Sequence, residues 1–344
     1  MKEKALVLST ILLFFANFFF AQEQKQAELK VSNWTFSLEG GMGLRIGTYN
    51  EIVWAKRSYD NERYKQSELE YRLRPSFYTA LNFSVNYKRL GFKLSNKFFI
   101  ASKAGTLTDS DWRNDSSCQN GDTTTKTDFS EHTLFLKDKF GGIAGFDLEL
   151  KGDYKFYPAN WLSLAPLLSF NVQYMSFLAK DGYGYYGVHD YKNNRILPYN
   201  DIATRQTYSF EGKKVIEYEA YNFFIWTGIG AKFTPLSWLH FELASEFSPV
   251  SLLLDFDKHL TNSKDFKEIV FSTLSAFRQS VKAEFILKKN FSICQTCVFV
   301  ISKESEGAMY YKKSEDSSYQ RISKNSGGGK VTYFDLELSL KFSW

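Results

Sequence analysis

Cysteine, histidine and proline are scarce in this chain, and the shortage of cysteine argues against disulfide-based, thiol-redox and zinc-binding proteins. The 344 residues include 3 cysteines, 4 histidines and 6 prolines. Cys294 and Cys297 form a CQTC, but the segment around them reads as a strand, where positions three apart lie about 10 Å apart on opposite faces. That separation exceeds the limit for a disulfide, so neither a redox motif nor a zinc site is expected. Cys118 falls in a polar segment that we interpret as a loop.

The chain also lacks a strong excess of charge and, after its first residues, any long apolar run. Its 43 basic and 38 acidic residues are interspersed, which gives no reason to expect a nucleic-acid partner. Lys2 and Lys4 precede the apolar stretch 5–20, which ends at Ala21. This pattern predicts an export signal over residues 1–21 and one mature domain over 22–344, since the run is short for a retained membrane helix.

Strict alternation of apolar and polar residues is what the sequence has in abundance. From Leu69 to Lys88 one set of positions is mainly apolar and the other polar, over about 20 residues, far longer than an ordinary strand. The same pattern recurs up to Trp344 and predicts ten strands. They are expected at residues 34–56, 66–88, 92–104, 132–157, 161–180, 214–233, 238–257, 268–288, 291–312 and 329–344.

The connections between these segments alternate in length. Short turns near residues 89–91, 158–160, 234–237 and 288–290 alternate with long polar loops. An even number of strands with short turns at one end and long loops at the other is typical of bacterial outer-membrane proteins. We therefore expect an all-β fold, a ten-stranded antiparallel transmembrane β-barrel whose long strands extend above the membrane. A passive porin fits poorly, because ten strands enclose little space beyond their own side chains.

One strand changes phase and thereby brings ionisable residues to the inner face. Phe241, Leu243 and Phe247 place odd positions outward, whereas the apolar residues of LLLDFDKHL (252–260) place even positions outward. An extra residue near Ser248-Pro249 explains the change, because proline within sheets is favoured at bulges. Asp255, Asp257 and His259 then face the barrel interior.

A second acidic pair, Asp109 and Asp111, lies in LTDSDWRNDSS (107–117), which we expect to begin a long loop. Both acidic segments fall at the long-loop end of the inferred barrel. With DSDWRNDSS, the stretches TKTDFSEH (125–132), DFDKH (255–259), NEIVW (50–54) and SKNSGGGK (323–330) resemble the omptins, outer-membrane endopeptidases built on a ten-stranded barrel. The motifs occur in the family's order across the mature chain.

The resemblance implies catalytic roles for Asp109, Asp111, Asp257 and His259. Histidine titrates near neutrality and can accept a proton from water, and a neighbouring aspartate can orient the ring and stabilise its charged form. The first pair would hold the attacking water from the opposite rim. For an unperturbed imidazole, activity should fall below about pH 6.

The resemblance further implies that Glu51 and Asp255 bind a basic side chain before the cleaved bond and that Asp128 serves the residue after it. Peptides or proteins with Lys/Arg pairs are the expected substrates. No metal or cofactor is expected apart from an outer-leaflet lipid such as lipopolysaccharide.

That lipid is bound in the family by basic residues on the outer wall. Tyr174 and Tyr218 stand where arginine is expected here, so either another basic residue binds it or the lipid dependence differs. We expect the protein in the outer membrane with its active site facing the exterior. The alternative is a catalytically silent barrel that acts as an adhesin or host-protein receptor. His132, the glycines 327–329 and the tryptophans receive no functional assignment.

Overall fold

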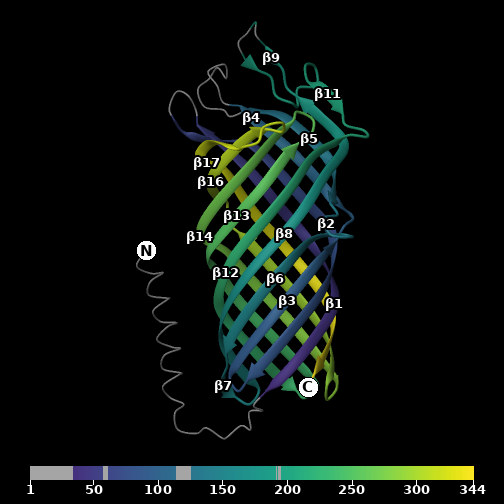
Figure 1. Ribbon diagram of the computed structural model, residues 1–344, viewed down its shortest axis with the longest axis vertical. Coiled ribbons are helices and arrows are strands. Elements are labelled where there is room, and N and C mark those ends of the chain that lie inside the picture. Colours follow the sequence, from purple (N-terminus) through teal and green to yellow (C-terminus); the bar gives the residue numbers. More distant parts are fainter. Residues whose placement is uncertain (1–33, 57–60, 114–124, 191, 193–194) are drawn as a thin grey trace.

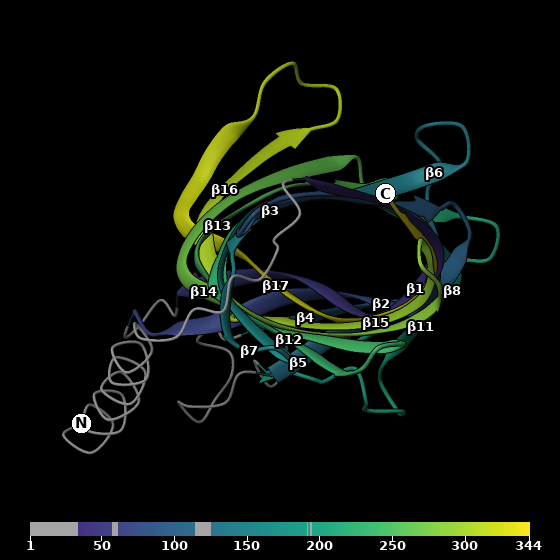
Figure 2. The ribbon, with the colours of Figure 1, turned by 90° about the horizontal axis from the view of Figure 1, so that it is seen from below.

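In the computed structural model the chain forms one antiparallel sheet closed into a ring (Figures 1 and 2). The structure describes residues 34–344 except 57–60, 114–124, 191 and 193–194. The expected export signal and Cys118 lie outside these residues. Closure is made by the first strand, which pairs with both the second and the last strand.

Ten tilted walls make up the ring, three of them split into two consecutive strands. In ring order they are β1 (Thr35–Lys56), β2 (Arg63–Tyr87), β3 (Leu90–Ile100) with β4 (Lys103–Arg113), β6 (Ile143–Tyr154) with β5 (Thr125–Leu136), β8 (Leu162–Tyr186), β12 (Lys214–Leu236), β13 (Leu239–His259), β14 (Lys264–Lys288), β15 (Phe291–Ser302) with β16 (Ser305–Lys313), and β17 (Gln320–Ser343). The predicted ten-stranded barrel is confirmed. The third wall is longer than expected, however, so Asp109 and Asp111 lie within strand β4 and not in a loop.

The two ends of the barrel differ. The lower end in Figure 1 carries tight turns, the C-terminus and the short strand β7 (Phe156–Ala159). The upper end carries the longer connections with β9 (His189–Asp190), β10 (Arg195–Ile196) and β11 (Gln206–Ser209). Among the described residues there is no long apolar helix that could span a bilayer.

The outer wall of the lower half is apolar, as strand alternation requires. Large exposed apolar residues include Leu38, Met42 and Ile46 on β1 and Phe241, Leu243 and Phe247 on β13. Exposed tryptophans at positions 34, 161, 238 and 344 border this band at the lower end. A belt of exposed apolar side chains with an aromatic border is the surface that a bilayer covers.

Two proline-associated bulges separate the lower half of the barrel from the upper half. The register between β12, β13 and β14 shifts around Ser248–Val250, which confirms the predicted bulge at Pro249. A second shift on β2, at Arg74–Pro75, was not predicted. It reverses the phase of β2, so Leu69 and Tyr71 point inward, whereas Phe77 points outward. The single phase expected from residue 69 to residue 88 is therefore wrong.

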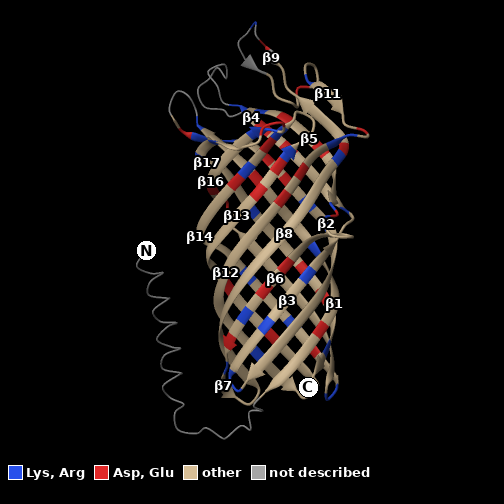
Figure 3. Cartoon of the chain, in the orientation of Figure 1, with Lys and Arg blue, Asp and Glu red and all other residues tan. Residues whose placement is uncertain are grey.

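Ion pairs cross the lower lumen and neutralise its buried charges. The Arg45 guanidinium lies 2.7 Å from Asp335 and 2.8 Å from Asp147. Arg278 likewise lies 2.5 Å from Glu149 and 2.8 Å from Glu246. Figure 3 shows acidic and basic residues interspersed along this part of the barrel. Each buried carboxylate named here has a cationic partner, as a desolvated charge requires.

Replacing Arg45 with methionine should lower the free energy of unfolding by about 3–5 kcal/mol, because Asp335 and Asp147 would lose the guanidinium that they share. Urea unfolding of the refolded protein in detergent micelles measures the change. The control is Arg74→Met, which removes an exposed arginine of β2 and should change stability by less than about 0.5 kcal/mol. Equal losses in the two variants would contradict the role of the network.

Candidate active site

Two strands on different sides of the ring bring four ionisable residues to the upper lumen. Asp109 and Asp111 lie on β4, and Asp257 and His259 lie on β13. In each pair the residues are two apart, so their side chains share the inner face of a strand. Both pairs lie beyond the apolar band, since Asp257 and His259 follow Phe247 and the bulge on β13.

Asp257 and His259 are in direct contact. His259 Nε2 lies 2.5 Å from Asp257 Oδ2, and Asp257 is 1% exposed whereas the histidine side chain is 23% exposed. Burial by itself would lower the pKa of His259, but the carboxylates of Asp257, Asp109 and Asp111 outweigh burial and raise it to about 9. This pKa favours the imidazolium at neutral pH and shifts the expected acid limb of activity to higher pH than for an unperturbed imidazole.

The β4 aspartates form a coupled acidic pair that acts on the histidine. Burial and the charge of Asp111 raise the pKa of Asp109 to about 8, and burial also raises the pKa of Asp111. The charge of His259 opposes both rises, so the histidine on β13 and the two aspartates on β4 belong to one electrostatic group in the lumen. A pKa of about 8 favours a proton on Asp109 at neutral pH, beside Asp111.

Three further carboxyls, Glu51, Asp255 and Glu268, form what we call the acid cluster. Asp255 and Glu268 are directly opposite each other on β13 and β14, and both are 0% exposed. Glu51 on β1 is 3% exposed and belongs to the same electrostatic group. Asp255 precedes Asp257 by two positions, so the cluster lies on the membrane side of the four candidate catalytic groups.

Burial first, and then repulsion from Asp257 and among the three carboxyls, raise the pKa values of the acid cluster. The pKa of Asp255 rises to about 8, and those of Glu51 and Glu268 rise well above their usual range. Asp255 accepts hydrogen bonds from the Tyr218 hydroxyl at 3.0 Å and from the Glu268 backbone N–H at 3.1 Å. Within the described residues, no lysine or arginine forms an ion pair with any of the three carboxyls.

Polar atoms in and beside the acid cluster lack partners. Glu51 Oε2, Glu268 Oε1 and the Tyr71 hydroxyl are buried without a hydrogen bond among the described residues. Tyr71 stacks on Tyr218 with 4.5 Å between ring centroids. Buried acceptors left unpaired cost stability, so a hydrogen-bond donor that enters this region is stabilised there.

The glycine run 327–329 fits around the acid cluster and is not a loop. It lies within β17, where the Gly328 N–H donates to Glu268 Oε2 at 2.9 Å. A Cβ on Gly327 would come within 2.7 Å of the Glu268 carboxyl carbon. Glycine is therefore required here for close approach.

Asp128 lies beside the β4 pair, directly opposite Asp111 on the neighbouring strand β5. Burial and then Asp111 raise its pKa, while Arg113 opposes the rise. Two positions apart on the same strand, Ser130 and His132 form a buried pair with 2.8 Å between Oγ and Nε2. His132 Nδ1 lies 2.7 Å from the Asp181 carbonyl, so this histidine contacts the backbone of β8.

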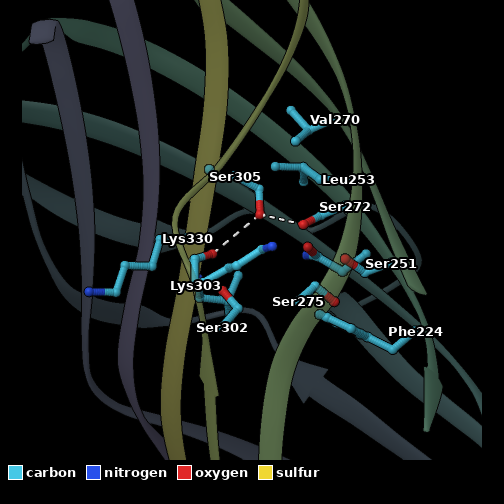
Figure 4. Close-up of a pocket in the computed structure, with 13 residues that line it drawn as sticks. Phe224, Ser251, Leu253, Val270, Ser272, Ser275, Ser302, Lys303, Ser305 and Lys330 are labelled. Carbon is cyan, nitrogen blue, oxygen red and sulfur yellow. Dashed lines mark hydrogen bonds between the residues drawn. The ribbon is translucent and has the colours of Figure 1, made fainter. Parts of the chain in front are cut away.

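A small cavity lies in the wall on the membrane side of the acid cluster, where β15 ends and β16 begins (Figure 4). It has a volume of about 30 Å³ and is lined by Leu253, Val270, Gly329 and several serines. The Ser305 hydroxyl donates to Ser272 at 2.8 Å across it. Such a space holds one or two water molecules and is too small for a substrate side chain.

Comparison with known proteins agrees with this arrangement. The sequence model of the omptin family matches residues 32–344. The chain belongs to the omptin family. No curated protein sequence matches it.

Among solved structures, the outer membrane protease OmpT from Escherichia coli superimposes with a TM-score of 0.73 at 15% identity, over 92% of this chain and 99% of that one. The transport unit of the autotransporter AIDA-I from Escherichia coli, at 12% identity over 96% and 97% of the two chains, has a TM-score of only 0.31 and supports no argument. Family and fold together assign this omptin to the outer membrane.

The outer wall of this omptin differs from the expectation for lipid contacts. Tyr218 points into the barrel, where it binds Asp255, so it is not the outer-wall counterpart of an arginine. Tyr174 donates a hydrogen bond to Glu219. Two nearby lysines are paired with glutamates, Lys137 with Glu217 at 2.6 Å and Lys139 with Glu219.

Sequence reasoning missed Glu268. No sequence motif marks Glu268. Its importance follows from its position opposite Asp255 in the β13–β14 register. The sequence of the connecting turn, residues 260–263, does not reveal that register. Within the described residues no cluster has the arrangement of a metal site.

The acid cluster should make stability fall as pH rises. A carboxyl whose folded pKa is raised stabilises the fold while protonated, and that contribution is lost from about pH 4.5, the unfolded pKa of glutamate, up to its folded pKa. Glu51→Gln should therefore reduce the slope of the free energy of unfolding against pH by up to about 1.4 kcal/mol per pH unit in that window. Urea unfolding at pH 5 and pH 8 measures the slope, and an unchanged slope would contradict the coupling.

Proposed function

We propose that the protein is an outer-membrane endopeptidase that cleaves peptide bonds next to basic residues with a water activated by aspartate and histidine. One observation supports the proposal above all: His259 contacts Asp257 and feels the charges of Asp109 and Asp111, next to buried carboxyls that form no ion pair among the described residues. Family membership supports proteolysis, and all four side chains that the family resemblance implies are present.

His259 is the base in the proposed reaction. Because Asp257 contacts Nε2, Nδ1 is the ring nitrogen left to accept a proton from water. Asp257 then stabilises the imidazolium that forms, as the acid does in a serine triad. Asp109 and Asp111 hold the water from β4, and the proton on Asp109 can be donated to the developing oxyanion.

The acid cluster binds the basic side chain before the cleaved bond through Glu51 and Asp255. A cation entering there removes the repulsion among buried carboxylates, which is the largest favourable change available to the site. The same positive charge disfavours the imidazolium of His259 and thereby makes the neutral base more available in the complex. Asp128, beside Asp111, is placed to contact the residue after the bond, and a basic residue there completes a dibasic site.

The first test is digestion of a dibasic peptide by the refolded protein. His259→Ala should lower kcat/KM by about 10²–10⁴, the usual contribution of a general base. With the wild-type enzyme, replacing the arginine before the cleaved bond of the peptide with alanine should greatly lower kcat/KM. Replacing the arginine after the bond should lower kcat/KM less. Added lipopolysaccharide tests the predicted lipid requirement in the same assay. Equal rates for the wild type and His259→Ala would refute the mechanism.

The second test is the pH profile. The pKa of about 9 for His259 makes the neutral base the minor form at pH 7, so kcat/KM should rise about tenfold per pH unit from pH 6. The rise should end between about pH 8 and pH 9, because Asp109, with a pKa of about 8, loses the proton that it donates. Asp109→Asn removes one carboxylate that raises the pKa of His259, so the acid limb should move to lower pH even though the rate falls. Circular dichroism at each pH controls for unfolding. A rate independent of pH between 6 and 9 would exclude His259 as the base.

A further inference from the structure

Glu268 is the member of the acid cluster for which the proposed function has no role. It is fully buried, and its position opposite Asp255 puts two carboxyls side by side on one face of the β13–β14 pair. Like charges directly opposite one another destabilise a sheet. Glutamine would fill the same space without that penalty, so stability alone does not explain a glutamate at this position.

The surrounding backbone is shaped to hold this carboxyl. The Gly328 N–H donates to Oε2, and the absence of a side chain at Gly327 makes room for the carboxyl carbon. The other oxygen, Oε1, has no partner among the described residues. One oxygen of Glu268 is therefore fixed and the other is left free as an acceptor.

Glu51 presents a second free acceptor from another side of the cluster. Its Oε2 is buried and unpartnered, and β1 and β14 are separated in the ring by β17 and by β15 with β16. By contrast, both oxygens of Asp255 already accept hydrogen bonds, from Tyr218 and from the Glu268 backbone N–H. A ligand that satisfies the cluster must thus carry positive charge and donate in more than one direction.

These requirements separate arginine from lysine. A guanidinium presents five N–H donors in a rigid planar fork and remains charged in any protein site, whereas an ammonium is a compact charge that loses its proton more readily on burial. Desolvation among carboxyls with raised pKa values favours transfer of a lysine proton to a carboxylate, which would remove the charge attraction. Arginine keeps that attraction.

We propose that Glu268 is a third substrate-binding carboxylate that makes the site selective for arginine over lysine before the cleaved bond. The inference rests on the proposed endopeptidase activity and adds a specificity-determining residue to it. Glu268 contacts the substrate side chain and takes no part in proton transfer.

The test uses two peptides that differ only in arginine or lysine before the bond. The wild type should cleave the arginine peptide with at least about tenfold higher kcat/KM, as one charge-assisted hydrogen bond gives. In Glu268→Gln the ratio should approach one, through loss of activity on the arginine peptide. Glu304→Gln, which changes an exposed glutamate outside the strands, should keep the wild-type ratio.

Thermal unfolding of Glu268→Gln at pH 8 separates recognition from a structural role. If Glu268 serves recognition, removing a buried acid that has no cationic partner should raise the unfolding temperature while the selectivity for arginine falls. If Glu268 is only structural, the substitution should lower the unfolding temperature and reduce cleavage of both peptides equally. If Glu268→Gln does not refold, Glu268→Asp, which retracts the free oxygen, takes its place. Cleavage of both peptides by the wild type at equal rates, or an unchanged ratio in the variant, would overturn this inference alone. Cleavage of neither peptide would overturn the proposed function as well.

Discussion

Closure of the sheet is the constraint on which the rest of the structure depends. Once β1 pairs with both β2 and β17, every second residue of each wall is enclosed, and any charge placed there must be neutralised from within. The lower lumen meets this requirement through Arg45 and Arg278, each shared between two carboxylates. The upper lumen does not, because its acid cluster has no cationic partner among the described residues.

This contrast links recognition to chemistry through one electrostatic field. The carboxyls that raise one another's pKa values in the cluster lie next to Asp257, which together with Asp109 and Asp111 raises the pKa of His259 to about 9. A cation bound at the cluster therefore stabilises the carboxylates and destabilises the imidazolium at the same time. In the proposed reaction, binding of a basic substrate side chain would in this way make the neutral imidazole more available.

The sequence predicts the direction of a side chain only as far along a strand as apolar and polar residues alternate without a bulge. The number of walls, the polar interior and the inward direction of Asp255 and Asp257 follow from period-two patterns, and Pro249 marks the bulge that produces that direction. The bulge at Pro75 was not predicted, because the inward residues Leu69, Tyr71 and Leu73 are as apolar as the outward residues that follow the bulge. The resemblance to a family identified the catalytic candidates, but Glu268 becomes visible only when the register pairs it with Asp255.

The bulges explain how one strand serves two environments. Below Pro249, β13 presents Phe247 to the outer band and Glu246 to the paired network of Arg278; above it, the same strand presents Asp255 and Asp257 inward. In a strand without a bulge, the same alternate positions face inward along the whole length. The positions that face the bilayer in the lower half would then also fix which positions face inward at the site. A proline at the bulge forms no ladder hydrogen bond that the bulge would break, so the phase change costs little. The candidate catalytic and substrate-binding side chains are in this way carried on strands instead of on loops.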